Sequence, residues 1–169
     1  MYNSWAALYH SRIGNKSMDN DYSQRELTQI KEIAQGARNI FELILEDSMR
    51  TRETQGSCLY ASILLSNCIN KFTKASSKIC GGGPPINGGF WDASGVCRGH
   101  YWVQGITSEG LAFVADITAD QFGLEKIVVL TLDQAKNCYQ PGDALEIARQ
   151  VKETLAEIGE EFKDIDGLN

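Results

Sequence analysis

Hydrophobic and polar positions divide the chain into a helical first part, a strand-rich middle and a helical end. From residue 23 to 45, apolar residues recur at three- and four-residue steps, which is the spacing of an amphipathic helix. Ser23-Gln24-Arg25-Glu26 has the form of a capping box, so we expect this helix to begin at Ser23. Its expected core face is Leu27, Ile30, Ile33, Ala34, Ala37, Ile40, Phe41, Ile44 and Leu45, and its expected wet face includes Lys31, Glu32, Arg38 and Glu46.

A second, more buried helix is predicted from Cys58 to about Phe72, after a polar connection over residues 47–56. The following sequence CGGGPPINGG, residues 80–89, combines glycines with two adjacent prolines, and this composition favours a loop. Because it lacks a Gly-Lys-Ser/Thr ending, the loop does not indicate a phosphate site. We expect it to lie at the surface or at the rim of a cleft.

Three segments with β-branched and aromatic residues then predict strands at His100–Ile106, Leu111–Ile117 and Ile127–Leu132. A closing helix is predicted from Pro141, with Asp143 and Glu146 near its start. Its apolar positions are Leu145, Ile147, Ala148, Val151, Leu155, Ile158 and Phe162. This order predicts an α+β fold, with N-terminal helices packed on a small antiparallel sheet and a C-terminal helix.

Composition narrows the class of protein. The 169 residues are 43% hydrophobic and 22% charged, which suits a single globular domain over 1–169, with residues 1–20 as a docked arm. The net charge of −6 argues against binding nucleic acid. The sequence has no basic, apolar leader and no apolar stretch long enough for membrane insertion, so we expect a cytoplasmic protein, with leaderless secretion as the alternative. The oligomeric state is left open.

The cysteines number five, without CxxC pairs, which indicates a reducing compartment rather than a disulfide framework. Cys97-Arg98-Gly99-His100 brings two possible metal ligands together, and Cys58, Cys68 or Cys80 are candidates to add more. Structural zinc generally uses two close ligand pairs, and only one is present. A zinc site therefore remains the weaker alternative, and we expect no metal or cofactor.

Cys58 has a second interpretation, as a nucleophile. It follows Gln55-Gly56-Ser57 at an expected helix start, where unpaired backbone N–H groups and the positive end of the helix dipole favour a thiolate. The same amides are suited to hold an oxyanion. By position alone, however, a cysteine at a helix start is more often a small apolar residue that packs in the core.

His100 opens a strand in which His100 and Trp102 share one face. The connection Thr107-Ser108-Glu109-Gly110 resembles a hairpin turn and would return Asp116, the end of the next strand, to the side of His100. A carboxylate in that place orients an imidazole and fixes its tautomer. A turn residue is the plainer interpretation of Asp116.

These residues together resemble the transglutaminase-like branch of the papain-like cysteine hydrolases. The similarity lies in Gly56-Ser57-Cys58, in His100-Tyr101-Trp102-Val103 and in Asp116-Ile117-Thr118, and it covers about residues 55–122, the expected catalytic core. The resemblance implies a papain-like core in which Cys58 is the nucleophile, His100 the general base and then acid, and Asp116 the group that holds His100. Asp120 is a competing partner for His100. The oxyanion-hole candidates are Gln55, Trp102, Gln104 and Gln121.

The implied activity is that of a thiol peptidase or amidase, which cleaves peptide or amide bonds of a protein or peptide substrate through a thioacyl intermediate. The same catalytic triad also serves protein glutamine deamidases and transglutaminases, including secreted effectors. A non-catalytic or zinc-stabilised binding domain is the alternative from another class.

Overall fold

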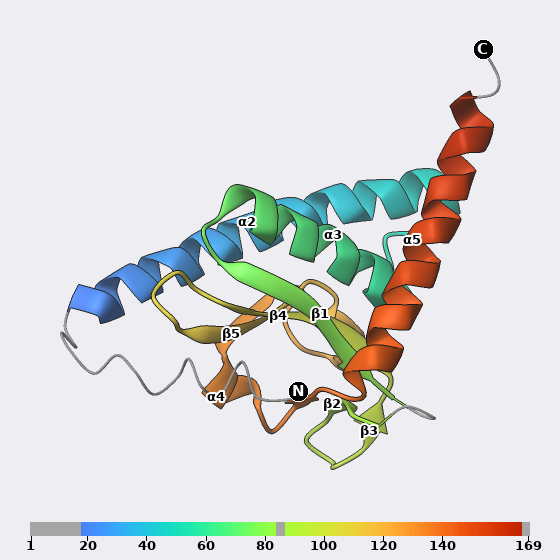
Figure 1. Ribbon diagram of the computed structural model, residues 1–169. Coiled ribbons are helices and arrows are strands. Elements are labelled where there is room, and N and C mark those ends of the chain that lie inside the picture. Colours follow the sequence, from blue (N-terminus) through green and yellow to red (C-terminus); the bar gives the residue numbers. More distant parts are fainter. Residues whose placement is uncertain (1–17, 84–86, 167–169) are drawn as a thin grey trace.

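The protein has an α+β fold, as the order of sequence patterns predicts (Figure 1). The structure, a computed structural model, describes residues 18–83 and 87–166, so most of the expected N-terminal arm lies outside it. The elements are α2 (Met18–Met49), α3 (Cys58–Phe72), β1 (Ser76–Gly82), β2 (Gly89–Trp91), β3 (Cys97–Arg98), β4 (His100–Ile106), β5 (Ala112–Asp116), the 3₁₀ helix η1 (Ala119–Phe122), β6 (Val128–Thr131), α4 (Leu132–Ala135), β7 (Tyr139–Gln140) and α5 (Ala144–Asp166). Among the described residues, no helix is long and apolar enough to cross a membrane.

The central sheet is antiparallel, with strand order β1-β4-β5-β6. The three predicted strands are β4, β5 and β6, to within a residue at each end. The register aligns Val103 with Ala115, so His100 and Asp116 lie diagonally across neighbouring strands at one end of the sheet. A smaller sheet, β3-β2-β7, packs beside that end.

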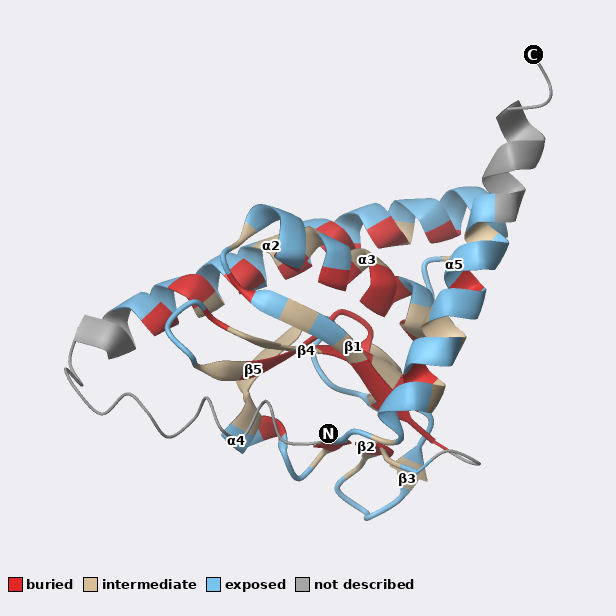
Figure 2. Ribbon diagram, in the orientation of Figure 1, coloured by how far each residue is buried: buried red, intermediate tan, exposed pale blue. Residues whose placement is uncertain are grey.

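The two N-terminal helices cover one face of the central sheet, and their buried residues face it (Figure 2). That core contains Ile30, Ala34, Ala37, Phe41, Leu45, Ala61, Leu65, Ile69, Ala75, Val103, Phe113, Ala115 and Ile117. On the other face, a second cluster of Cys80, Phe90, Trp102, Val114, Ala135 and Tyr139 joins the two sheets. The alternation along β4 therefore separates Trp102 from Val103, as predicted.

The expected start of the first helix at Ser23 is wrong. Helix α2 already includes Met18, and Ser23 lies inside it as a buried residue. Glu26 does not close a capping box, because its Oε2 accepts hydrogen bonds from the backbone N–H and the hydroxyl of Ser108, at 2.9 and 2.8 Å. A tertiary contact therefore uses the residue that the local pattern assigned to a cap.

The predicted core face of α2 also needs correction. Ile40 and Ile44 are exposed, whereas Arg38, expected on the wet face, is only 2% exposed. The buried residues Ile30, Ala34, Ala37, Phe41 and Leu45 form a narrower stripe than the apolar pattern suggests. Arg38 is buried because Glu42 of the same helix and the distant Asp120 both pair with it, and the helix pattern carries no information about Asp120.

The glycine-rich segment is partly a strand and not only a loop. Gly81 and Gly82 belong to β1, the edge strand beside β4. A Cβ at Gly81 would lie 2.5 Å from the Tyr101 ring, so the missing side chain makes room for that ring. The outer edge of β1 is capped, since Asn70 bonds both backbone groups of Ser77 and the Gly142 N–H donates to the Gly81 carbonyl.

The C-terminal helix α5 is present as predicted, and it packs on β1 and α3. The Asp143 carboxylate accepts hydrogen bonds from the N–H groups of Leu145 and Glu146, which caps the helix. Ile147 is buried, but Leu145 and Leu155 are exposed, so the expected apolar face is only partly used.

Candidate active site

Cys58 is the first residue of α3, as predicted. The chain reaches it through a turn in which the Ser57 N–H and hydroxyl both donate to the Thr54 carbonyl. Gly56 has φ +80°, a left-handed conformation that strains other residues, so glycine suits this turn. The first backbone N–H groups of a helix have no partner within it, and Cys58 therefore lies where these donors gather.

His100 and Asp116 form the closest contact of the site. The Nε2 atom of His100 lies 2.7 Å from Oδ2 of Asp116, and the two side chains are 0% and 1% exposed. The antiparallel register of β4 and β5 produces this contact, because the hairpin returns the end of β5 beside the start of β4. The predicted pairing of His100 with Asp116 is thus present in the structure.

Two further residues hold the Asp116 carboxylate. Its Oδ1 accepts hydrogen bonds from the N–H and hydroxyl of Thr118, at 2.8 and 3.1 Å. Its Oδ2 also accepts the Tyr139 hydroxyl at 3.0 Å. Sequence reasoning missed Tyr139, since it belongs to the two-residue strand β7 and no local pattern links it to Asp116. These donors fix the position of the carboxylate that orients His100.

Aromatic rings surround the His100 imidazole. Phe122 meets it edge-on with ring centroids 4.8 Å apart, and Phe90, Trp102 and Tyr139 lie within 6.4 Å. Burial among these rings lowers the pKa of His100, but the charge and hydrogen bond of Asp116, followed by the hydrogen bond and charge of Cys58, raise the pKa to about 9. The apolar surroundings leave the Asp116 charge poorly screened, so the imidazolium is favoured.

Cys58 is therefore a neighbour of His100, close enough for its side chain and charge to contribute to the raised pKa of the imidazole. Since Asp116 engages Nε2, the nitrogen that remains for the thiol is Nδ1. Cys58 is only 9% exposed. Burial and the charges of Cys58 and Glu146 raise the pKa of Tyr101, whose hydroxyl donates to Gln150 of α5.

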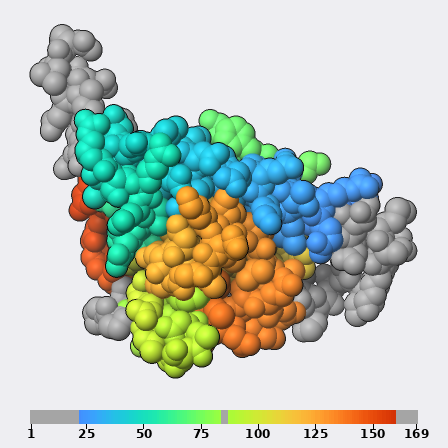
Figure 3. Space-filling model, turned by 180° about the vertical axis from the view of Figure 1, so that it is seen from behind, coloured from blue at the N-terminus to red at the C-terminus, as the bar shows by residue number. Residues whose placement is uncertain are grey.

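Asp120, the competing partner for His100, has a different role. It forms a two-point ion pair with Arg38, with N···O distances of 2.9 and 2.7 Å, and accepts the Thr54 hydroxyl at 3.2 Å. Arg38 also donates to the Ile117 carbonyl at 2.5 Å. The segment after Asp116 is thereby fastened to α2 and to the turn before Cys58, and from behind it lies against both (Figure 3).

The predicted oxyanion-hole candidates occupy different places. Gln55 is exposed in the turn before α3. Trp102 is 1% exposed, and within the described structure its indole Nε1 has no hydrogen-bond partner. Gln104 accepts a hydrogen bond from the Cys80 thiol at 3.2 Å. Trp102 stacks near the His100 ring, whereas Gln121 makes a polar contact with it, with its Nε2 atom 3.3 Å from Nδ1.

Two of the other four cysteines are less suited to nucleophilic chemistry, because burial raises their pKa. All five are free. Burial raises the pKa of the Cys80 thiol to about 11, against the opposing charge of Lys78, and burial also raises the pKa of Cys68. The Cys97 thiol donates to the Gly88 carbonyl at 3.2 Å. Within residues 18–83 and 87–166, no cluster of three or more histidine, cysteine or acidic side chains is arranged to hold a metal ion.

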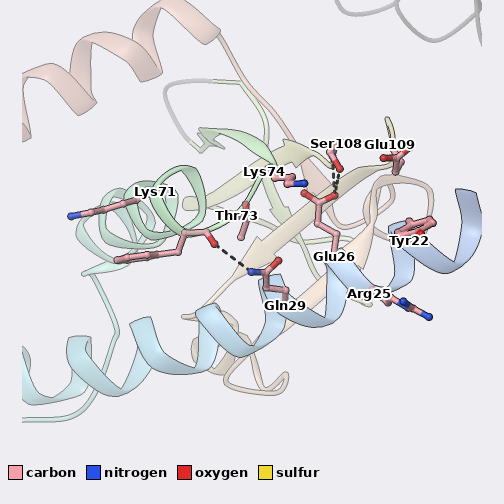
Figure 4. Close-up of a pocket in the computed structure, with 10 residues that line it drawn as sticks. Tyr22, Arg25, Glu26, Gln29, Lys71, Thr73, Lys74, Ser108 and Glu109 are labelled. Carbon is pink, nitrogen blue, oxygen red and sulfur yellow. Dashed lines mark hydrogen bonds between the residues drawn. The ribbon is translucent and has the colours of Figure 1, made fainter.

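A pocket of about 590 Å³ lies away from this site, at the far end of β4 (Figure 4). Residues from α2, the end of α3 and the β4–β5 turn line it, among them Glu26, Lys71 and Ser108. It contains neither a thiol nor an imidazole; of its two acidic residues, Glu26 is already bonded to Ser108 and Glu109 is exposed. The pocket therefore lacks the side chains that a nucleophilic active site needs.

Stability should depend on pH through His100. Its folded pKa of about 9 exceeds the ordinary value of 6.5, so its contribution to stability is fully present below pH 6.5 and is lost as the pH rises through about 9. We expect the free energy of unfolding to fall by up to about 3 kcal/mol across this range. Urea unfolding at pH 6.5, 8 and 9.5 measures it. His100→Gln should flatten the profile, and parallel profiles for the two proteins would contradict the assignment.

Comparison with known proteins adds no assignment, because no family model, curated protein or solved structure matches this chain. The site is thus characterised by its own geometry. A thiol lies at a helix N-terminus beside an imidazole, and a buried carboxylate holds the imidazole from the other side.

Proposed function

We propose that the protein is a cysteine-nucleophile hydrolase of the papain-like and transglutaminase-like kind, acting on peptide or amide bonds with Cys58, His100 and Asp116 as its catalytic triad. The observation that carries this proposal is His100, which contacts Asp116 through Nε2 at 2.7 Å and has Cys58 as a further neighbour. This order of groups favours a thiolate, and it agrees with the motifs in the sequence.

The chemistry follows from the positions of these groups. The Cys58 thiol transfers its proton to Nδ1 of His100, and the thiolate attacks the substrate carbonyl carbon. The N–H groups of the first turn of α3 stabilise the resulting oxyanion. As the C–N bond breaks, the imidazolium returns its proton to the departing amine, which leaves a thioacyl enzyme. Water activated by His100 then releases the acid and restores the thiol.

Three activities share this intermediate. Water as the acceptor gives hydrolysis of a peptide bond, or deamidation when the donor is a glutamine side chain. An amine as the acceptor gives transamidation. Incubation of the protein with a proteome, followed by mass spectrometry, distinguishes cleaved chains, deamidated glutamines and cross-links. Intact chains with none of these changes, from a protein whose Cys58 is reactive, would exclude the peptidase and glutamine-directed activities.

Cys58 should be the most reactive of the five thiols. Under limiting iodoacetamide at pH 7, we expect Cys58 to be labelled first and His100→Ala to slow that labelling by about tenfold or more. Peptide mapping by mass spectrometry measures both rates. Cys80, whose pKa is raised to about 11, is the matched buried control and should be labelled slowly in every variant.

Cys58→Ala should abolish turnover and leave the fold intact. The substitution removes one sulfur atom from a residue at the helix end, so we expect a loss of stability of about 1 kcal/mol. Early labelling of Cys97 or Cys138 with an inert Cys58 would show that the nucleophile is misassigned.

A further inference from the structure

Gln121 is a polar side chain beside the imidazole that the proposed chemistry does not use. It comes from η1, the short helix that follows Thr118. Its Nε2 atom lies 2.8 Å from the Thr118 carbonyl oxygen and 3.3 Å from Nδ1 of His100. The nitrogen thus faces two acceptors, and its two hydrogens are enough to serve both.

The orientation of the Gln121 amide follows from its partner. A carbonyl oxygen only accepts hydrogen bonds, so the amide group nearest Thr118 must be the NH₂ group rather than the oxygen. A donor is therefore held against Nδ1 of His100. This contact is favourable only while Nδ1 carries a lone pair, which means that the ring proton lies on Nε2 and points to Asp116.

Two donors then compete for one lone pair. The Cys58 thiol must give its proton to Nδ1 to become a thiolate, and Nδ1 then donates instead of accepting. The Gln121 N–H loses its acceptor at that step. The titratable groups that face the imidazole among the described residues are Asp116 from β5, Cys58 from α3 and, through Asp116, the Tyr139 hydroxyl from β7. Asp116 favours the imidazolium, and Gln121 opposes it.

We propose that Gln121 is a positioning residue that fixes His100 in the Nε2–H tautomer and, by competing with the thiol for Nδ1, sets the pH at which the Cys58 thiolate and His100 imidazolium form. This inference deepens the proposed function and depends on it for its consequence in catalysis. Its physical content, the protonation of His100, is measurable without a substrate.

The test compares full-length wild-type protein with Gln121→Leu, which removes the donor, and Gln121→Glu, which places an acceptor there. NMR titration of the His100 ring nitrogens should find the Nε2–H tautomer in the neutral wild type. Loss of one hydrogen bond should raise the pKa of His100 in Gln121→Leu by roughly 0.4–1 unit, and Gln121→Glu should raise it at least as far. Gln35→Leu, at an exposed glutamine of α2 that bonds Asn39, is the matched control.

Alkylation of Cys58 by iodoacetamide gives the second readout. On the plateau of its pH profile, where the neutral thiol–imidazole pair competes with the thiolate–imidazolium pair, we expect a rate up to roughly threefold to tenfold higher in Gln121→Leu than in wild type. An unchanged or lower pKa of His100 in both Gln121 variants, or a wild-type Nδ1–H tautomer, would overturn the inference. If the alkylation rate of Cys58 were the same in His100→Ala as in wild type, the proposed function would be wrong instead. The NMR titration of wild-type His100 would still decide the role of Gln121.

Discussion

Asp116→Asn should lower the rate of acylation by about a hundredfold or more. The substitution removes the charge that favours the imidazolium and replaces one carboxylate oxygen with an NH₂ group. That group would face either the Thr118 donors or the His100 and Tyr139 donors. The rate is measured in single-turnover assays with the substrate found by proteome incubation, and iodoacetamide labelling of Cys58 provides a substrate-free comparison.

Because Asp116 is 2% exposed and accepts four hydrogen bonds, the variant should also be less stable, by about 1–3 kcal/mol. Urea unfolding separates this effect from the rate. Asp120→Asn is the matched control, since it alters a carboxylate in the next turn that bonds Arg38 and Thr54 instead of His100. Its acylation rate should remain within about threefold of wild type when both are folded. Full turnover in Asp116→Asn, or none in folded Asp120→Asn, would show that the orienting carboxylate has been misassigned.

Arg38→Ala should lower the free energy of unfolding by about 3–5 kcal/mol. Arg38 is 2% exposed and bonds Glu42, Asp120 and the Ile117 carbonyl, so its removal leaves carboxylates and a buried carbonyl without their cation. Equilibrium urea unfolding at pH 7 measures the change.

A paired variant tests the reason for that loss. Arg38→Met together with Asp120→Leu removes both charges of the Arg38–Asp120 ion pair and keeps most of the volume, while Glu42 retains Lys126 as its partner. The double variant should therefore recover a large part of the stability lost in Arg38→Ala. Burial raises the pKa of Asp120, but its hydrogen bond and ion pair with Arg38 and the Thr54 hydroxyl lower it overall. The stabilising pair is therefore present above the ordinary aspartate pKa of about 3.9 and is lost as the pH falls below it. A loss below about 1 kcal/mol in Arg38→Ala would show that this network is only a surface ion pair.

The hydrogen bonds and ion pairs of Arg38 and Asp120 stabilise the fold and also hold the segments that carry the site. Thr54 precedes the turn that leads to Cys58, and Ile117 follows Asp116 directly. Asp120 holds both segments to α2 through Arg38 and Thr54. The helix that carries the thiol and the strand that carries the carboxylate are thereby tied to one buried guanidinium.

Local patterns located the elements that carry the site. The strand at His100–Ile106 and the helix at Cys58–Phe72 have the predicted bounds, since β-branched and aromatic alternation and a buried apolar run are local signals. The pairing of His100 with Asp116 was also predictable, because a tight hairpin determines which residues of two neighbouring strands meet. Asp120 was separable from Asp116 only by the Asp-x-Thr motif, and the structure gives it a separate partner in Arg38.

The order of helices and strands, and the hairpin that joins His100 to Asp116, follow from the sequence alone, since both depend on residues close together in the chain. Which polar groups are buried, and which groups they contact, depends instead on tertiary packing. Tyr139 reaches Asp116 from a two-residue strand, Gln121 reaches His100 from a 3₁₀ turn, and Arg38 is buried against Asp120. These contacts join segments far apart in the sequence, and burial of a polar group depends on such partners rather than on its neighbours in the chain.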